Sequence, residues 1–389
     1  MTPSTTTAGE TTDAVAPRPS AREALLRDWQ WVVLAFVASR LLIFAVIHFS
    51  RLVFVRAPFW HPGGVMSVLL QWDGELWYVN IARNGFSYSP VLPSSMGFFP
   101  FYPLLIRIAG FVFHDFRLAA LVVSHLCFLA AGFLLNGLIN LDYKDRRVNR
   151  AAIMFLMFSP VSFFFSNAYS ESTFLMLVLG AFFAARRGYW LVACLTAMCL
   201  AATRNVGFLV TLPLFVEYFR QNWRGLHSWK VLFHPRVLLF GIIPLGFASF
   251  LFIGWLLFGD PFAYVRATAV WGRRFTSPVN TFASLVWMPH FYRLLFTTVL
   301  GAGLLLWASG ILLRLRLSYM VYATMLITIY LCGASLEAIP RYLSIVFPLF
   351  IILGLIAARY PWSYVPLLSA SSALLTLCTI LSASGYWIT

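Results

Sequence analysis

The segment QWDGELWYVNIARNGFSYSPVLPSSMGFFPFYPL, residues 71–104, decides how the rest of the chain is interpreted. It is polar and carries the carboxylates Asp73 and Glu75, yet it lies between hydrophobic runs that would each fit a lipid bilayer. Tryptophan, tyrosine and asparagine side chains surround the two acids. This mixture favours a site for a polar, sugar-like ligand at a membrane surface.

The composition is that of an all-α polytopic membrane protein. Of the 389 residues, 61% are hydrophobic and only 11% are charged, whereas soluble domains carry about a quarter charged residues. The formal net charge of +15 fits cytoplasmic loops rich in lysine and arginine, and it requires no nucleic-acid partner. The five cysteines fall in apolar runs without CxxC or Cys/His spacing, so they are interpreted as packing residues.

Long hydrophobic runs divide the chain. Residues 1–29, rich in Thr, Ala, Ser and Pro, are predicted to be a disordered cytoplasmic tail. Residues 30–389 form one transmembrane unit, in which residues 51–116 are the first extracytoplasmic loop. Apolar runs of roughly 17–25 residues, several of them shorter, predict about eleven transmembrane helices, at 31–49, 117–140, 151–166, 171–187, 189–203, 206–219, 237–258, 294–314, 317–334, 343–358 and 363–384.

The run 98–113 is short and begins with prolines, so it is assigned to the outer leaflet or to a re-entrant position. The basic run KDRRVNR, residues 144–150, is then cytoplasmic. Polar segments that interrupt the apolar runs all emerge on the opposite face, and the charge count does not require this agreement. It therefore indicates one shared extracytoplasmic site, built from QWDGELW (71–77), SNAYSES (166–172), ATRNVG (202–207), GDPFAYVRATAVWGRR (259–274) and LEAIPRY (336–342).

Carboxylates beside several guanidiniums suit the transfer of a sugar from a lipid phosphate to a hydroxyl. A phosphate leaves as a stable anion, so one base and a cation at the leaving group are enough, and arginine can bind two phosphate oxygens at once. The outer acids are dispersed and form no DxD pair, so neither a metal nor a cofactor is expected. The candidates are Asp73 as catalytic base and, for substrate binding, Glu75, Glu171, Arg204, Asn205, Arg266, Trp271, Arg273 and Arg341.

Several candidates also have a structural interpretation. Asp73 could cap an interfacial helix, and Glu75 could be a solvated acid in its first turn. Glu171 could cap the helix that it begins. Arg341 could pair with Glu337 to pin a loop, and the segment beginning GDPF could be an interfacial helix with snorkelling arginines.

The motifs WDGELWYVNIARNGF, FFPFYPLLIR, YSESTFLML, TRNVGF, GDPFAYVRA followed by WGR, and PRYLSIVFPLF occur in this order. Together they resemble the landmarks of the PIG-V family of mannosyltransferases, within the GT-C superfamily, over residues 30–358. The resemblance implies a GT-C fold, an acid of the first outer loop at the catalytic centre, here Asp73, a dolichyl- or polyprenyl-phosphate mannose donor, and inversion at the anomeric carbon.

Compact loops, and Asn205 where the family pattern has a proline after the arginine, indicate a bacterial-type homologue with its own lipid or glycan acceptor. The expected location is then the bacterial plasma membrane, among membrane lipids, or the endoplasmic reticulum for a eukaryotic chain. Two other classes remain open: a lipid or solute transporter, and a noncatalytic subunit of a glycosyltransferase complex.

Overall fold

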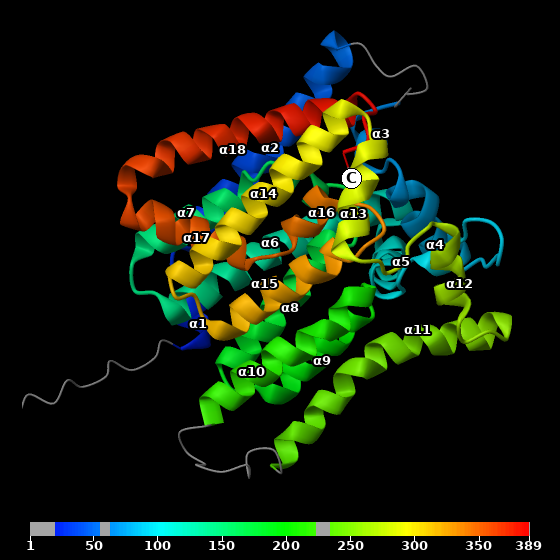
Figure 1. Ribbon diagram of the computed structural model, residues 1–389, viewed down its shortest axis with the longest axis horizontal. Helices are drawn as coiled ribbons and strands as arrows, with labels where there is room; N and C mark the ends of the chain where they lie inside the picture. Colours follow the sequence, from blue (N-terminus) through cyan, green and yellow to red (C-terminus); the bar gives the residue numbers. More distant parts are fainter. Residues whose placement is uncertain (1–19, 55–62, 223–233, 389) are drawn as a thin grey trace, which may run out of the picture.

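The computed structural model describes residues 20–54, 63–222 and 234–388. Long helices lie side by side across the view of Figure 1. In the described ranges the pairing of extended backbone is limited to one antiparallel bridge, between Phe275 and Gly333. The prediction of an all-α protein is therefore confirmed.

Helices occupy all the hydrophobic runs that were predicted to span the membrane. They are α2 (Trp29–Val53), α6 (Phe116–Asp142), α7 (Arg146–Met157), α8 (Glu171–Arg186), α9 (Trp190–Ala201), α10 (Thr211–Asn222), α11 (Ile243–Phe258), α14 (His290–Leu312), α15 (Leu317–Leu331), α17 (Pro348–Arg359) and α18 (Pro361–Ala383). In the described residues, five helical stretches are long and apolar enough to cross a membrane by themselves: Trp29–Val53, Phe116–Asp142, Pro235–Phe258, His290–Leu312 and Pro361–Ala383.

The chain is thus a multi-pass integral membrane protein, and its number of crossings stays a prediction. Short elements connect the long helices. They are α1 (Ala21–Leu26), α3 (Val65–Leu69), the π-helical turn η1 (Gly74–Val79), α4 (Asn80–Asn84), η2 (Ser95–Gly97), α5 (Phe101–Phe113), η3 (Ser162–Phe165), η4 (Asn205–Val210), η6 (Pro235–Ile242), α12 (Ala263–Val270), α13 (Pro278–Ser284), η7 (Leu285–Trp287) and α16 (Ile339–Ser344).

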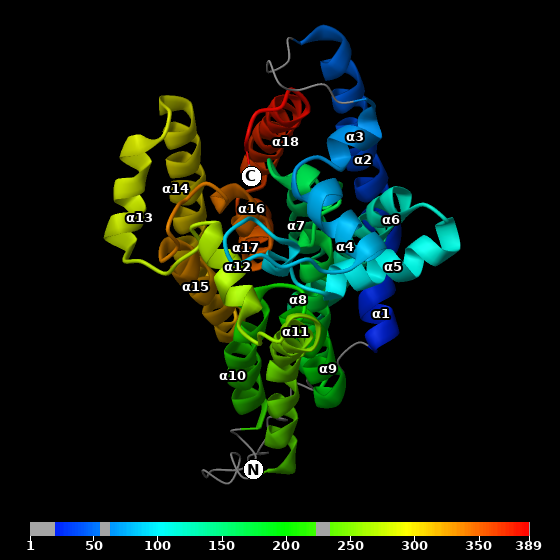
Figure 2. The same cartoon turned by 90° about the vertical axis from the view of Figure 1, so that its right-hand side faces the viewer.

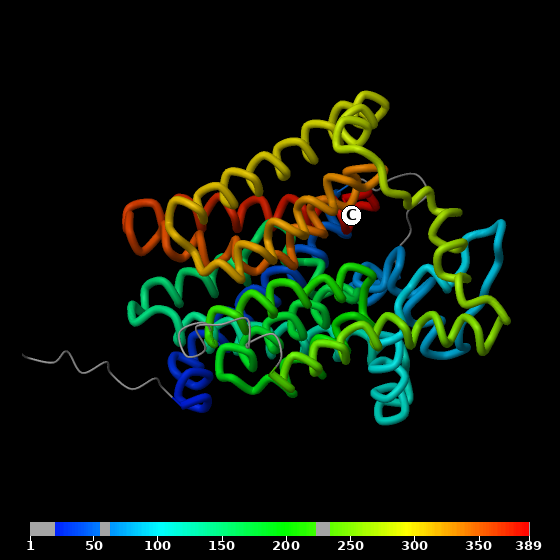
Figure 3. Tube along the Cα trace, turned by 60° about the horizontal axis from the view of Figure 1, so that its bottom comes forward, coloured from blue at the N-terminus to red at the C-terminus, as the bar shows by residue number. Residues whose placement is uncertain are grey.

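The short elements are not spread evenly over the molecule. Helices α3, α4, α12 and α13 gather at one end of the bundle, while α1 lies toward the other end (Figures 1 and 3). Figure 2 looks onto the first end, where α12 and α16 lie between α13 on one side and α4 and α5 on the other. We call this the loop-rich end. The predicted polar segments therefore do meet at one end of the bundle.

The predicted disordered tail is wrong for its last residues, because Ala21–Leu26 form a helix. Ser20 and Glu23 make a capping box in which each side chain accepts a hydrogen bond from the other residue's backbone N–H, at 3.1 and 2.7 Å. The amide of Asn140 on α6 then donates to the carbonyl of Ala24 at 2.9 Å. A short helix is stable here because α6 satisfies its free carbonyls. Residues 1–19 lie outside the described residues.

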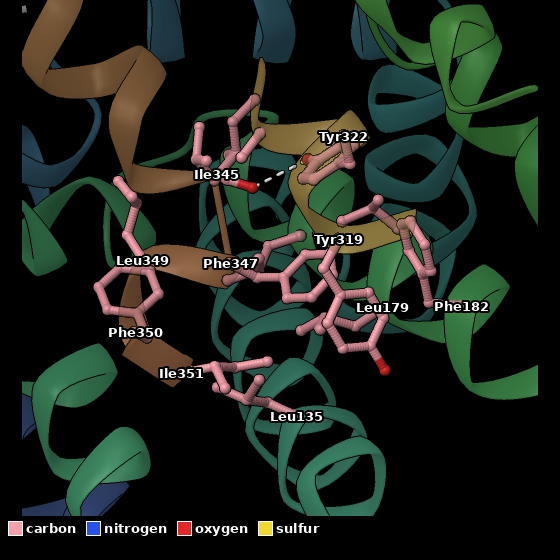
Figure 4. Close-up of a cluster of buried hydrophobic side chains, with 14 of the residues drawn as sticks. Leu135, Leu179, Phe182, Tyr319, Tyr322, Ile345, Phe347, Leu349, Phe350 and Ile351 are labelled. Atoms are coloured by element: carbon pink, nitrogen blue, oxygen red, sulfur yellow. Dashed lines mark hydrogen bonds between the residues drawn. The ribbon is translucent and has the colours of Figure 1, made fainter. Parts of the chain in front are cut away.

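An aromatic cluster lies between α8, α15 and α17 (Figure 4). The rings of Phe182 and Phe347 meet edge to face, with centroids 5.2 Å apart. Tyr322 packs on Phe347 and donates its hydroxyl to the carbonyl of Ile345 at 2.9 Å (Figure 4). Ile345 directly follows α16, so this bond fixes where that short helix ends. The cluster thereby supports the helix that carries Arg341.

Arg40 is a buried cation in the middle of α2. Its guanidinium donates to the carbonyl and hydroxyl of Ser162 and to the hydroxyl of Ser166, and it lies 4.7 Å from the ring centre of Phe128. In the described ranges it forms no ion pair with a carboxylate. Hydroxyls, carbonyls and a π face therefore replace water around the charge, and they hold the turn between α7 and α8.

A group of buried charges lies at the end of the bundle opposite the loop-rich end. Arg186 pairs with Asp142 at 2.7 Å, and Arg316 pairs with Glu217 at 2.6 Å. Tyr319 donates its hydroxyl to Asp142 at 2.7 Å. These groups tie α6, α8, α10 and α15 together without a net charge. This clamp is not predicted from the sequence, since its members are far apart along the chain.

We expect the two ends of the bundle to face opposite sides of the membrane. In a chain whose native cysteines are replaced by alanine, Asn280→Cys and Lys144→Cys place thiols at exposed positions of the two ends. On intact cells, an impermeant thiol reagent should label the first variant, whereas the second should react only after permeabilisation, because basic loops stay inside. Equal labelling of both on intact cells would contradict this topology.

Candidate active site

The carboxylate of Asp73 forms an ion pair with Arg341. Asp73 immediately precedes η1, and Arg341 lies on α16; its Nη1 is 2.8 Å from Asp73 Oδ2. The side chain of Asp73 makes no capping hydrogen bond to η1. Capping therefore does not explain this residue. Nor does Arg341 pair with the exposed Glu337, so the loop-pinning alternative is also wrong.

Glu171 is the centre of the cluster. It is the first residue of α8, it is fully buried, and it accepts hydrogen bonds from Nε of Arg341 and Nη1 of Arg204. Two carboxylates thus face two guanidiniums, so the cluster with Asp73 is neutral. Buried ion pairs persist only when their partners compensate the loss of hydration. The N-cap residue of α8 is Ser170, which makes no capping hydrogen bond with its side chain, and the Glu171 carboxylate binds the two guanidiniums instead.

Burial by itself would lower the pKa of the Arg341 guanidinium. The carboxylates of Glu171 and Asp73 outweigh burial and raise that pKa well above its ordinary value. Arg341 therefore stays charged throughout the physiological range, and its charge orients both acids.

Aromatic rings surround the guanidiniums. Arg341 lies over the ring of Tyr169 at 4.4 Å, and Arg204 lies over Tyr342 at 5.5 Å. Cation–π contacts of this kind gain strength where water is excluded. Neither tyrosine is among the candidate residues predicted from the sequence, although Tyr169 lies in the predicted polar segment 166–172 and Tyr342 in the segment 336–342. Their position in these segments was the signal that could have indicated them.

Several predicted residues, among them Glu75, Arg266 and Asn205, lie outside this cluster. Glu75 pairs with Arg117 at 2.7 Å, and both side chains are about two-fifths exposed, at 42% and 41%. Arg266 pairs with Asp260 at 3.1 Å and is 61% exposed. Glu75 and Arg266 each pair with a nearby residue of opposite charge, so neither side chain lies at Asp73. Asn205 is exposed at the start of η4.

The rings of Trp77, Phe98 and Trp271 form an aromatic platform, and the guanidinium of Arg273 lies at its edge. Trp77 and Phe98 stack with centroids 5.3 Å apart, and Trp271 meets Trp77 edge to face at 5.4 Å. The guanidinium of Arg273 lies 5.9 Å from the Phe98 centroid and 5.7 Å from that of Trp271. No carboxylate among the described residues pairs with Arg273. The Nε1 atom of Trp271 is buried and also has no hydrogen-bond partner among them.

Tyr78 connects this platform to the ion-pair cluster. Its ring contacts Phe98 edge to face, with centroids 5.3 Å apart, and its hydroxyl is 3.0 Å from that of Ser170. Ser170 directly precedes Glu171. The loop that carries Arg273 is fixed from its other side by the bridge between Phe275 and Gly333. A continuous wall of side chains therefore joins the carboxylate of Asp73 to Arg273, which has no carboxylate partner among the described residues.

The backbone that presents Asp73 is strained. Trp72 has φ 58°, in the left-handed region that bulky residues avoid at a cost of about 1–2 kcal/mol. The π-helical turn η1 follows, entered by a hydrogen bond from Glu75 N–H to the carbonyl of Leu70 at 2.7 Å. Left-handed residues and π-turns are both frequent at functional sites.

The model of the family described as Mannosyltransferase (PIG-V) matches residues 59–257, just over half of the chain. The chain belongs to the PIG-V mannosyltransferase family. Asp73, Glu171 and Arg204 fall inside the matched region, whereas Arg341 lies beyond it. The resemblance inferred from the motifs is confirmed.

Two curated relatives show the extent of the similarity. GPI mannosyltransferase 2 of Drosophila melanogaster is 29% identical over 147 residues, which are 33% of this chain and 32% of that protein. GPI mannosyltransferase pigv-1 of Caenorhabditis elegans is 28% identical over 142 residues, 31% of this chain and 20% of that protein. This chain thus spans about a third or less of the length of these relatives.

Solved structures show that the PIG-V chain has the GT-C fold, as expected. ArnT from Cupriavidus metallidurans, crystallised with undecaprenyl phosphate, matches 91% of this chain and 76% of its own with a TM-score of 0.55 and 14% identity. The apo oligosaccharyltransferase of Archaeoglobus fulgidus matches 94% of this chain and 57% of its own with a TM-score of 0.51 and 13% identity. At such identities the likeness concerns the fold.

Removing the central carboxylate should destabilise the protein strongly. Glu171→Ala removes the carboxylate that Arg204 and Arg341 share, so Arg204 loses its ion-pair partner and Arg341 keeps Asp73 alone. Breaking a buried pair in this way costs about 3–5 kcal/mol. Chemical unfolding in detergent micelles measures the loss. The control Glu337→Ala removes an exposed acid from the same end of the bundle, and it should change stability by less than about 0.5 kcal/mol. Equal effects of the two variants would show that the cluster contributes no stability.

Proposed function

We propose that this PIG-V family member is a membrane glycosyltransferase. It transfers a mannosyl group, or a related hexosyl group, from a polyprenyl-phosphate donor to a hydroxyl of a lipid or glycan acceptor. One observation carries the proposal. The side chain of Asp73 is held by a buried charge network, and a wall of aromatic rings leads from it to Arg273, which has no carboxylate partner among the described residues.

Asp73 is suited to act as the general base. Its ion pair with Arg341 orients the carboxylate, while its side chain remains 16% exposed and can be reached. The acceptor oxygen attacks the anomeric carbon, the bond from that carbon to the phosphate oxygen breaks, and the acceptor proton passes to Asp73. The family resemblance implies that the anomeric configuration inverts.

The charge of the leaving group explains why an arginine without a carboxylate partner is needed. A sugar phosphodiester with one negative charge becomes a lipid phosphate with a second charge as the glycosidic bond breaks, so a nearby cation stabilises the transition state more than the ground state. Arg204 and Arg341 already satisfy Glu171 and Asp73. Arg273 is therefore our candidate for the phosphate, and Trp271 for stacking on the sugar or the isoprenoid.

The donor and the location follow from several lines of support. The ArnT structure, which shares this fold, contains undecaprenyl phosphate, and we infer a donor of the same chemical class here. The basic segment 144–150 lies at the end opposite the cluster, so the positive-inside rule favours an extracytoplasmic site. We propose the bacterial plasma membrane for this chain, with an acceptor different from that of the eukaryotic relatives.

A transporter or a noncatalytic subunit would share the same spans. Transporters hold their ionisable groups near the bilayer midplane, between repeated halves, whereas the Asp73 cluster lies among the short helices of the loop-rich end. A single assay separates the three classes. The purified chain, reconstituted in liposomes with a radiolabelled polyprenyl-phosphate mannose, should transfer label to an acceptor by itself; uptake of label without transfer would favour a transporter.

Asp73→Asn should lower kcat by a factor on the order of 10² to 10⁴, the usual contribution of a general base. The protein should stay folded and bind donor, because Arg341 keeps its contacts with Glu171. Saturating kinetics with the purified enzyme measures the effect, and Glu337→Gln serves as the control for an exposed acid at the same end. Normal turnover by Asp73→Asn would move the search for the base to Glu171.

Transfer should survive treatment with a chelator. Both acids of the cluster already face guanidiniums, and arginine supplies the positive charge that a divalent cation would otherwise provide at the phosphate. The rate measured in EDTA should equal the rate measured with added magnesium or manganese. Activity that disappears in EDTA and returns with either metal would overturn this part of the mechanism.

A further inference from the structure

The end of α18 reaches back to the loop that presents Asp73. The buried side chain of Gln71 donates its amide to the hydroxyl of Ser382 at 2.6 Å. The rings of Trp72 and Trp387 meet edge to face, with centroids 4.8 Å apart and planes at 81°. The two residues immediately before the candidate base are thus both held by the segment Ser382–Ile388. The family match ends at residue 257, far before this segment.

The segment has a defined path after the helix. Gly385, at φ 85°, forms a Schellman turn in which its N–H donates to the carbonyl of Ser382 at 3.1 Å and that of Tyr386 donates to Leu381 at 3.0 Å. A left-handed residue at this position suits glycine. The turn brings Trp387 back toward the bundle, where the backbone N–H of Trp387 donates to the hydroxyl of Tyr292 at 3.2 Å. Ile388 is then buried.

The loop needs support at this point. Trp72 has a left-handed backbone, which a tryptophan adopts only where surrounding contacts determine it. If φ of Trp72 relaxed to its usual negative range, the chain direction after it would change, and the Asp73 carboxylate would leave Arg341. A contact from the site itself also supports the loop: the hydroxyl of Tyr169 donates to the carbonyl of Gln71 at 3.2 Å.

We propose that Ser382 and Trp387 are positioning residues for catalysis, because they hold Gln71 and Trp72 in the conformation that directs Asp73 to Arg341. The segment does not touch the reacting atoms, so its effect is on the geometry of the base. This inference rests on the proposed role of Asp73 as a base. It makes the end of α18, which lies outside the residues 59–257 matched by the family model, a requirement for full activity.

Trp387→Ala tests the proposal. It should lower kcat roughly 10- to 100-fold, since small displacements of a catalytic group cost about this much, while the KM for the donor stays within about twofold. Trp387→Phe keeps an edge-to-face ring and should recover most of the rate. The control Trp362→Ala removes an exposed tryptophan at the other end of α18, and it should leave kcat and KM unchanged.

A double-mutant cycle identifies the contact that matters. If Trp387 acts through the ring of Trp72, the double variant Trp72→Ala, Trp387→Ala should be no slower than Trp72→Ala alone. Multiplying effects would show that Trp387 acts elsewhere and would overturn the proposal. We call the contacts of Ser382 and Trp387 with Gln71 and Trp72 the brace. Should Trp387→Ala fail to fold, Ser382→Ala tests the brace by removing the hydrogen bond from Gln71, with an expected loss in kcat of roughly fivefold.

Hydrogen exchange separates this inference from the proposed function. In Trp387→Ala, the backbone amides of residues 70–76 should exchange about tenfold faster than in the wild type and in Trp362→Ala. This readout needs no turnover. Faster exchange in a protein whose wild type transfers no sugar would keep the brace and reject the function. Unchanged exchange and unchanged kcat in Trp387→Ala would reject the brace and leave the function standing.

Discussion

The carboxylate of Glu171, shared by the guanidiniums of Arg204 and Arg341, is the interaction on which the candidate site depends. It joins the start of α8, the turn between α9 and η4, and α16 at one buried point. Without it, two cations would face each other in a region from which water is excluded. With it, Arg341 has one nitrogen left for Asp73, and this last contact links the buried network to the proposed base.

Charge compensation also explains how short helices make a stable membrane bundle. At the far end, the clamp of Asp142, Arg186, Glu217 and Arg316 joins four helices without net charge. Such neutral networks tolerate burial, because every charge has a partner with good geometry. The guanidinium of Arg273 has no carboxylate partner among the described residues and lies at the edge of an aromatic platform, which suggests an anionic ligand.

The loop that presents Asp73 shows how strain and support are combined. A left-handed Trp72 and a π-turn set the direction of the carboxylate, and contacts from separate parts of the chain keep that direction. Arg341 holds the side chain, Tyr169 holds the backbone before it, and the end of α18 holds the neighbouring residues. A carboxylate fixed in this way loses little entropy when a ligand binds.

The sequence alone determined the membrane class and the helical character of the apolar runs, and it singled out Asp73, which the structure places in the ion-pair cluster. These follow from local properties: apolar runs must become helices in lipid because each backbone group needs an internal partner, and polar motifs stand out against them. Even the helix missed at Ala21–Leu26 had a local signal, the Ser20 and Glu23 capping box.

Only the tertiary structure decided which charges meet. Glu171 and Arg341 are 170 positions apart and pair because α8 and α16 converge, whereas Glu75 and Arg266 were drawn to nearer partners, Arg117 and Asp260. Ion pairs depend on distances of a few ångströms between side chains, and helix packing sets those distances. Hydropathy and residue type therefore predicted the participants, and three-dimensional packing chose their partners.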